Sequence, residues 1–189
     1  MGFHTYDPDR AENLEDTTRF RYCSREELLG GLGLAEPEPV TLADLGSGTG
    51  FYTDEVAPFV DRLYAVDVQA AMHDHYRAKG VPDAVDLVTA EVADLPFGDD
   101  ALDGAFSTMT YHEFASDGAL RELRRVLAPT APLVTVDWSA EGAGERGPPT
   151  DERYDLAAAL DHHEAAGFRV ERATARPETF VLVARAPEA

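Results

Sequence analysis

The stretch from Val40 to Thr53 limits the fold of this chain more than any other part of it. Its first half carries apolar residues at positions 40, 42, 43 and 45, a run typical of a central parallel strand that is buried on both faces. Three glycines alternating with Ser47 and Thr49 follow. From Phe51 the pattern becomes helical, with positions 51, 56 and 60 as candidate packing positions. A strand, a glycine-rich turn and a helix in this order open a nucleotide-binding α/β unit, in which the helix start favours an anionic group.

The spacing of the glycines narrows the kind of nucleotide. A dinucleotide fingerprint would require glycine at the position of Phe51, and a P-loop would require a Gly-Lys-Ser/Thr ending that the stretch lacks. The order Asp44-Leu-Gly46-Ser47-Gly48-Thr-Gly50 instead resembles the first motif of the class I S-adenosylmethionine (SAM) methyltransferases. The resemblance implies SAM as cofactor, bound in part by the acidic residue, the serine and the three glycines of this motif. A glycine-rich turn in another type of α/β protein is the alternative.

A second candidate contact follows the next apolar run. Residues 63–66 predict a strand that ends at Asp67. A carboxylate at such a strand end can accept hydrogen bonds from both ribose hydroxyls of a nucleoside. Considered alone, Asp67 could be a helix cap; beside the glycine motif we favour ribose binding. In SAM methyltransferases, residues at the positions of Val68 and Met72 pack on the adenine, so we include both in the expected cofactor site.

The third predicted strand, residues 85–89, leads into a segment that ends in Leu-Pro-Phe at position 97. This segment is similar to one in the ubiquinone/menaquinone-biosynthesis-like methyltransferases. In that family an acidic residue at the position of Glu91 faces the adenine amino group, and the next backbone N–H, here that of Val92, reaches a ring nitrogen. Family members more often carry Asp here, so Glu91 is a departure, and an ordinary surface acid is the alternative.

The fourth predicted strand, residues 103–108, ends in Met-Thr-Tyr-His-Glu-Phe. Ligands of open α/β sheets bind at the carboxyl ends of the strands, so cofactor and substrate should meet here. We therefore assign Ser107 to the cofactor site and His112 to the methyl acceptor, as orienting group or proton acceptor. The similar family segment often carries a histidine at this point. If a helical turn begins here, Tyr111 and Glu113 point elsewhere; alternatively, His112 itself packs against the following helix.

The rest of the chain completes the expected architecture. A helix over residues 120–127 and a strand over 133–138 follow, although the turn between them reads Pro-Thr-Ala-Pro where the family usually has Pro-Gly-Gly. A last helix (156–167) precedes two closely spaced strands, residues 168–174 and 179–185. These must pair antiparallel because no helical crossover fits between them. The sequence predicts an α/β, Rossmann-like SAM-methyltransferase fold: a mostly parallel seven-stranded sheet, helices on both faces and a C-terminal antiparallel hairpin. We expect a single domain over 1–189, with an N-terminal arm and helix (1–39) and a core (40–186).

The charge of the chain excludes some partners. Thirty-six acidic residues against 16 basic ones give a net charge of −20, and Lys79 is the only lysine. Such a surface repels nucleic acid and anionic membranes. It resembles the surfaces of proteins from extreme halophiles, so we expect a halophilic archaeal source. No segment resembles a signal peptide, and no apolar run approaches the ~20 residues of a membrane span. We expect a soluble, cytoplasmic protein.

No metal site is predicted. Cys23 is the only cysteine, and no Cys/His zinc spacing occurs. Two histidine pairs, His73 with His75 and His162 with His163, lie on predicted helices. Side chains one or two positions apart on a helix point in different directions, so we interpret these histidines as solvated surface residues.

The first functional hypothesis is a SAM-dependent methyltransferase that acts on a small molecule. Methyl transfer from a sulfonium is an in-line displacement in which positioning does most of the catalysis. A base is needed only when the acceptor must lose a proton. The alternative is a non-catalytic SAM-binding sensor or partner subunit; a nicotinamide dehydrogenase is disfavoured by Phe51. The arm over residues 1–23 is either flexible or a lid over the pocket, and a homodimer is left open.

Overall fold

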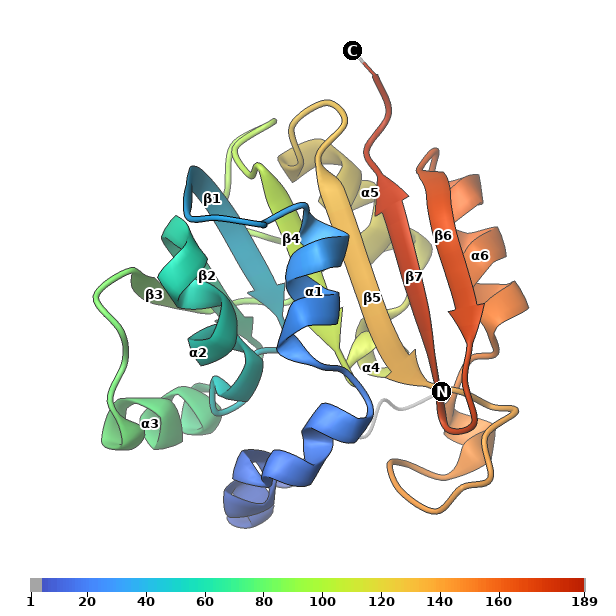
Figure 1. Ribbon diagram of the computed structural model, residues 1–189, viewed down its shortest axis with the longest axis horizontal. Coiled ribbons are helices and arrows are strands. Elements are labelled where there is room, and N and C mark those ends of the chain that lie inside the picture. Colours follow the sequence, from blue (N-terminus) through green and yellow to red (C-terminus); the bar gives the residue numbers. More distant parts are fainter. Residues whose placement is uncertain (1–4, 189) are drawn as a thin grey trace.

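A computed structural model describes residues 5–188 and contains a seven-stranded sheet in the order β3-β2-β1-β4-β5-β7-β6 (Figure 1). The strands are β1 (Glu38–Leu45), β2 (Val60–Asp67), β3 (Val85–Thr89), β4 (Gly104–Thr108), β5 (Pro132–Trp138), β6 (Arg169–Ala175) and β7 (Thr179–Arg185). Strands β1 to β5 pair in parallel, whereas β7 runs antiparallel to both β5 and β6. The mixed sheet with its C-terminal hairpin confirms the predicted architecture.

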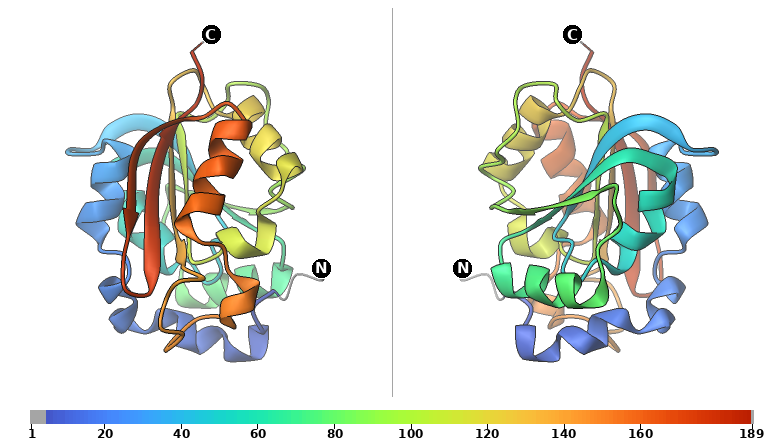
Figure 2. Two further views of the ribbon diagram at one scale, coloured as in Figure 1. Left: turned by 90° about the vertical axis from the view of Figure 1, so that its right-hand side faces the viewer. Right: turned by 90° about the vertical axis from the view of Figure 1, so that its left-hand side faces the viewer.

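Helices cover both faces of this sheet, as the edge-on views of Figure 2 show. The α-helices are α1 (Arg25–Leu32), α2 (Phe51–Val56), α3 (Ala70–Lys79), α4 (Tyr111–Phe114), α5 (Asp117–Val126) and α6 (Leu156–Ala165). Short 3-10 helices are η1 (Pro8–Glu15), η2 (Thr17–Arg21), η3 (Ala57–Phe59) and η4 (Thr150–Glu152). One apolar cluster joins the sheet to α1 and α2, and the other joins it to α4, α5 and α6. The described helices include none long and apolar enough to cross a membrane.

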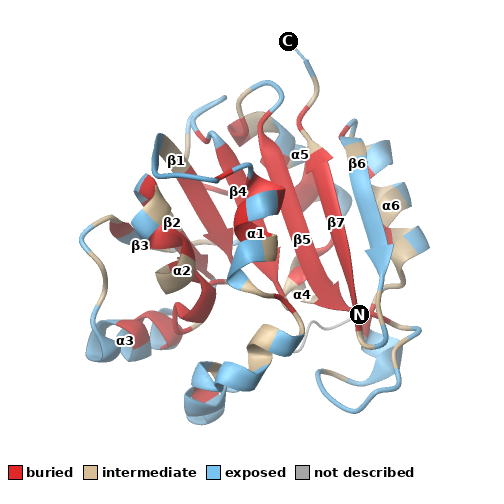
Figure 3. Cartoon of the chain, in the orientation of Figure 1, coloured by how far each residue is buried: buried red, intermediate tan, exposed pale blue. Residues whose placement is uncertain are grey.

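Burial follows the position of each strand in the sheet (Figure 3). Every residue of β4 and β5 is buried, which explains their continuous apolar runs, because central strands meet helices on both faces. The edge strand β6 is mostly exposed and carries charged residues. Among the predicted bounds, residues 85–89 and 179–185 match β3 and β7. Val60 was expected on the helix after the glycines but begins β2, because Pro58 lies in the turn η3 that separates α2 from β2.

The N-terminal arm crosses the carboxyl ends of the parallel strands, at the bottom of Figure 1. Asp7 and Asp16 cap its two 3-10 helices by accepting hydrogen bonds from backbone N–H groups two residues on. Glu15 accepts a hydrogen bond from Thr49 of the glycine turn and pairs with Lys79 of α3. Residues 5–22 are therefore packed over the turn rather than detached from it. Phe3 and His4, which belong to the expected arm, lie outside the described residues.

Candidate functional site

The glycine turn between β1 and α2 depends on glycine for two reasons. Gly46, Gly48 and Gly50 all have positive φ, at 76°, 55° and 83°. A Cβ on Gly46 would lie 2.3 Å from Thr110 Cγ2, and one on Gly50 would lie 2.2 Å from the Tyr76 ring. Neither the backbone conformation nor the space tolerates a side chain there. The turn is thus packed tightly against the end of β4 on one side and against α3 on the other.

Two cavities adjoin this turn at the carboxyl ends of the strands. The larger has a volume of about 270 Å³ and the smaller about 60 Å³. Both are lined by Gly46, Asp67, Thr110 and Glu113, so they meet along these residues. The larger cavity has mainly apolar walls, among them Val66, Val68, Ala90, Val92 and Phe114. The smaller one is bounded by the glycine turn, the end of β4 and the arm, including Tyr6, Leu14, Arg19, Ser47, Met72 and Met109.

Asp67 lies where the two cavities meet. Its carboxylate accepts hydrogen bonds from the backbone N–H groups of Gly48 and Gln69, each at 2.8 Å. Each carboxylate oxygen has capacity for a further donor. Burial raises the pKa of Asp67 above its ordinary value. The next residue, Val68, is 47% exposed and is the only large apolar side chain so exposed between residues 5 and 188. Together with the other apolar walls of the larger cavity, Val68 forms the kind of apolar lining that is typical of small-molecule sites.

The structure brings most of the predicted cofactor residues together. Eight of them line the cavities, namely Gly46, Ser47, Gly48, Asp67, Val68, Met72, Glu91 and Val92. Met72 lies on the side of the smaller cavity, away from Val68. Gly50 instead supports the turn from behind, against α3.

Asp44 and Ser107 are buried behind the turn. One carboxylate oxygen of Asp44 accepts a hydrogen bond from Thr53 at 2.6 Å, and the other has no partner among the described residues. The hydroxyls of Ser107 and Ser47 also lack a partner there. Burial raises the pKa of Asp44 to about 7. Buried polar atoms are normally hydrogen-bonded, so the unpaired hydroxyl of Ser47 in the wall of the smaller cavity suits a polar ligand, whereas Asp44 and Ser107 line neither cavity.

His112 is held by a buried carboxylate at the end of β5. Its Nδ1 lies 3.0 Å from both oxygens of Asp137, and its backbone N–H donates to the same carboxylate at 2.7 Å. Burial acts to lower the pKa of His112, but the adjacent Asp137 outweighs it and the pKa lies above its ordinary value. With Nδ1–H donated to Asp137, Nε2 is left to accept a proton. His112 lines neither cavity.

Glu113 lines the pocket at the position that was expected for His112. The prediction that Glu113 points away from the pocket was wrong, because its side chain lines both cavities and its Oε1 lies 3.9 Å from His112 Nε2. The reason is the long-range contact with Asp137, which turns the imidazole toward β5. Tyr111 points into the core and bonds His162 at 3.0 Å, as expected for a residue directed elsewhere. Burial raises the pKa of Glu113 to about 7.

Two histidines expected at the surface are buried instead. His73 contacts Thr89 Oγ1 at 3.1 Å, and His163 contacts the carbonyl oxygen of Ala159 at 2.7 Å. Each lies on the face of its helix that packs inward, a fact that the spacing of the pair does not reveal. Among the described residues no group of His, Cys, Asp and Glu side chains is arranged to hold a metal ion.

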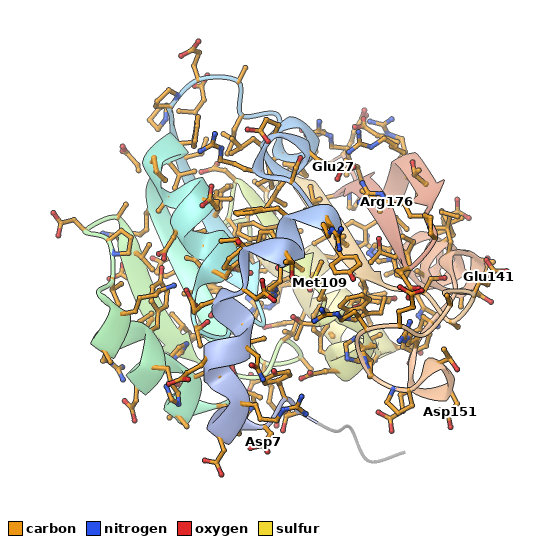
Figure 4. The ribbon with its side chains drawn as sticks, turned by 60° about the horizontal axis from the view of Figure 1, so that its bottom comes forward. Asp7, Glu27, Met109, Glu141, Asp151 and Arg176 are labelled. Carbon is orange, nitrogen blue, oxygen red and sulfur yellow. The ribbon has the colours of Figure 1, made fainter. Side chains whose placement is uncertain are left out.

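The cavity residues that were not predicted include three with polar side chains, namely Arg19, Thr110 and Glu113. Thr110 closes the turn, since its hydroxyl donates toward the carbonyl oxygen of Gly46 at 3.2 Å. The view onto the carboxyl ends in Figure 4 shows Met109 at the end of β4, beneath the arm. Met109 has a φ of 61°, an uncommon conformation for a side chain other than glycine, directly beside the cavity.

A parallel sheet closed by an antiparallel β7, a glycine turn after β1 and a carboxylate at the end of β2 define the class I SAM-methyltransferase architecture. Comparison with known proteins gives the same result. Residues 43–135 match the family described as "Methyltransferase domain". The crystal structure of a SAM-dependent methyltransferase from Aquifex aeolicus is 30% identical, with a TM-score of 0.86 over 96% of this chain and 100% of that one. The chain belongs to the SAM-dependent methyltransferases, and SAM is its cofactor.

Curated relatives match over a shorter segment. The bifunctional biotin-biosynthesis protein BioHC of Cellvibrio japonicus is 35% identical over 96 residues, which are 50% of this chain and 19% of that protein. The malonyl-[acyl-carrier protein] O-methyltransferase of Methylococcus capsulatus is 33% identical over 108 residues, 55% of this chain and 39% of that protein. Because the chain spans well under half of these relatives, their acceptors are not transferred to it. The methyltransferase match decides for an enzyme over a non-catalytic sensor.

Proposed function

We propose that SAM lies across the two adjoining cavities and that its methyl group passes to a small-molecule acceptor. The observation that carries this proposal is the position of Asp67 at the junction of the cavities. A carboxylate there suits the ribose, because both hydroxyls can donate to it. The adenine then occupies the larger, apolar cavity, and the amino-acid end of SAM occupies the smaller, polar one.

The walls of the larger cavity fit an adenine ring. Val68 and Val92 offer apolar surface to its faces. The Glu91 carboxylate is available to accept from the exocyclic amino group, and the Val92 N–H to donate to a ring nitrogen. These two assignments rest on the similarity to the ubiquinone/menaquinone-biosynthesis-like methyltransferases, the subfamily in which we place the chain.

The polar atoms near the smaller cavity fit the amino-acid end. The unpaired oxygen of Asp44 suits an ammonium group, and the unpaired hydroxyls of Ser47 and Ser107 suit either end group. Leaving such atoms unpaired costs about 1–3 kcal/mol each. A bound ligand that pairs with them therefore gains free energy that the empty site lacks. The backbone of Gly46, Gly48 and Gly50 shapes the wall on this side.

SAM supplies an electrophilic methyl group, and the chain supplies positioning and a route for a proton. Glu113 faces the cavities, and His112 lies behind it with Nε2 3.9 Å away. We infer that the acceptor's proton leaves toward this pair, with His112 as the base and Asp137 fixing its orientation. Three carboxylates line the cavities, at Asp67, Glu91 and Glu113, which favours a neutral or cationic acceptor over an anionic one.

The remaining assignments follow the charge and organisation of the chain. A net charge of −20 with one lysine supports a halophilic source and disfavours nucleic acid and anionic membranes as partners. We infer a single domain over residues 1–189, since the arm packs on the glycine turn of the core.

The test is the SAM affinity of Asp67→Ala, measured by calorimetry beside an Asp86→Ala control on the exposed edge of β3. Loss of two hydrogen bonds to a charged acceptor should weaken SAM binding by about 2–4 kcal/mol in Asp67→Ala, with no change in the control. An unchanged affinity in a folded Asp67→Ala protein would remove Asp67 from the site. A panel of small acceptors with methyl-labelled SAM then identifies the acceptor class.

A further inference from the structure

Arg19 forms no ion pair with any acidic residue that the structure describes, although Asp44 and Glu15 lie near enough to interact with its charge. It is the only basic side chain that lines either cavity within residues 5–188. Its Nη1 donates to the carbonyl oxygen of Leu14 at 2.7 Å. In the described part of the chain, its Nε and Nη2 form no hydrogen bond and the guanidinium forms no ion pair. A guanidinium carries five N–H donors, so most of its donor capacity is unused.

The guanidinium is held in place rather than free to swing. Its Cζ lies 5.0 Å from the centre of the Phe51 ring and 5.1 Å from that of Tyr52, both on α2 directly after the glycine turn. Such cation–π contacts and the carbonyl of Leu14 fix the group beside the smaller cavity. Burial lowers the pKa of Arg19 below its ordinary value, although a guanidinium stays charged at any relevant pH. A fixed, partly desolvated cation that forms no ion pair with a described residue favours binding an anionic ligand.

A second polar group at the same cavity supports this interpretation. Ser47 lines the smaller cavity, and its buried hydroxyl has no hydrogen-bond partner in the structure as described. A planar guanidinium and a hydroxyl donor together suit a carboxylate, which accepts several hydrogen bonds and pairs with arginine through two parallel ones.

We propose that Arg19, together with Ser47, binds the carboxylate at the amino-acid end of SAM. This rests on the proposed placement of the cofactor, in which the ribose at Asp67 directs that end into the smaller cavity. Because Arg19 belongs to η2, the cofactor carboxylate then joins the arm to the glycine turn. SAM is held from two sides, and the arm is part of the binding site.

The experiment compares SAM with decarboxylated SAM, which differs from it only in lacking the carboxylate. Calorimetry measures both ligands with the wild-type chain, with Arg19→Ala and with Arg21→Ala, an exposed arginine of the same 3-10 helix. In Arg19→Ala, SAM should bind roughly 10- to 100-fold more weakly, while decarboxylated SAM binds as it does to the wild type. Arg21→Ala removes the same charge and should leave both affinities unchanged.

Several outcomes would overturn the proposal. Equal weakening of both ligands in Arg19→Ala would mean that Arg19 only supports the arm, and no weakening of either would mean that it does not contact the cofactor. If Arg19→Ala fails to fold, Arg19→Lys replaces it: the charge is kept but the paired geometry is lost, so SAM alone should weaken by a smaller factor. Unchanged SAM binding in Arg19→Lys would then refute the role. A wild-type chain that binds neither ligand would instead refute the cofactor placement itself.

Discussion

Buried polar groups are paired differently in two regions of the molecule. The hairpin side comprises β6, β7, α6 and the segment 139–153, and the cofactor side comprises the residues around the two cavities and the strand ends behind them. On the side of the C-terminal hairpin, the nearly buried Arg153 donates to the carbonyl oxygens of Ser139, Arg146 and Pro148, and both ring nitrogens of His163 have partners. On the cofactor side, the described residues contain four buried atoms without a partner: Asp44 Oδ1, Ser47 Oγ, His73 Nε2 and Ser107 Oγ. Within residues 5–188, no such atom lies on the hairpin side.

This difference distinguishes polar groups that stabilise the fold from polar groups that are available to a ligand. Paired polar groups stabilise the hairpin side, whereas unpaired ones on the cofactor side each cost about 1–3 kcal/mol until something binds them. The uncommon φ of Met109 and the raised pKa values of Asp44 and Glu113 occur on the same side. Several unfavourable features thus lie near the cavities, where a bound cofactor can offset them, although Asp100 and Thr130 have a positive φ away from the cavities.

The largest expected effect concerns Asp44. Burial raises its pKa in the folded protein from 3.8 to about 7, so the unfavourable contribution is absent below pH 4 and is complete above pH 7. Asp44→Asn should therefore raise the free energy of unfolding at pH 8 by at most ~4 kcal/mol, with a smaller gain at pH 5. Denaturant unfolding at both pH values measures this. SAM affinity should fall at the same time, and a stabilised protein with undiminished affinity would contradict the comparison.

On the hairpin side, His163 serves as the control, because its contribution to stability changes with pH in the direction opposite to that of Asp44. Burial lowers the pKa of His163 to about 4, so the unfolded chain takes up the proton first as the pH falls. Its stabilising contribution is complete above pH 6.5 and is lost between pH 6.5 and 4. His163→Gln should flatten the loss of stability in that window without changing SAM affinity. An altered SAM affinity would show that the two sides are not independent.

The next effect is catalytic. His112→Ala should lower turnover by about a hundredfold if His112 is the base, while SAM affinity hardly changes. Asp137→Asn should lower turnover in the same direction, because the imidazole loses its fixed orientation. Once an acceptor is identified, steady-state kinetics and SAM calorimetry on both variants measure this. Wild-type turnover and acceptor affinity in His112→Ala would eliminate the assignment.

Two glycines, one in the glycine turn and one at the end of α1, separate the effect of backbone conformation from that of packing. Gly50 and Gly33 have similar φ values, 83° and 80°, but a Cβ would meet the Tyr76 ring at Gly50 and nothing within 4 Å at Gly33. Gly33→Ala should lose about 1–2 kcal/mol of stability from the backbone conformation alone. Gly50→Ala should lose a further 1–3 kcal/mol, roughly, from overpacking. Equal losses of unfolding free energy in the two variants, measured with denaturant, would show that the turn accommodates the added Cβ at Gly50 without further destabilisation.

The smallest difference between the two sides is expected in salt. Repulsion among the carboxylates of a chain with net charge −20 acts over the whole surface, and salt screens it. The thermal midpoint should rise from dilute buffer to molar potassium chloride. The protein should unfold in a single transition at each salt concentration. A flat profile in calorimetric scans would count against a halophilic source, and a split transition would show that the sides unfold separately.

Local sequence patterns predicted the features that depend on neighbours along the chain. The glycine turn, Asp67 at the end of β2, the bounds of β3 and β7 and the antiparallel hairpin all follow from short runs of residues. Contacts between distant segments were missed. The Asp137 carboxylate that orients His112 is 25 residues away, and Arg19 reaches the cavity through contacts of the arm with α2. No periodicity reports such pairings. The cavity residues of the glycine turn and of the end of β2 were therefore predictable, whereas those that distant segments bring to the cavities were not.

The reactivity of the single lysine of the chain can be used to follow the position of the arm. Lys79 Nζ lies 3.1 Å from Glu15 Oε2 of the arm and 2.8 Å from Asp54 Oδ2 of α2, so it links three segments at one ammonium group. An amine-reactive reagent therefore has one lysine side chain to modify, and that amine is occupied while the arm is seated. The rate of acylation at Lys79, read from its own peptide by mass spectrometry, reports the opening of the arm without an introduced label.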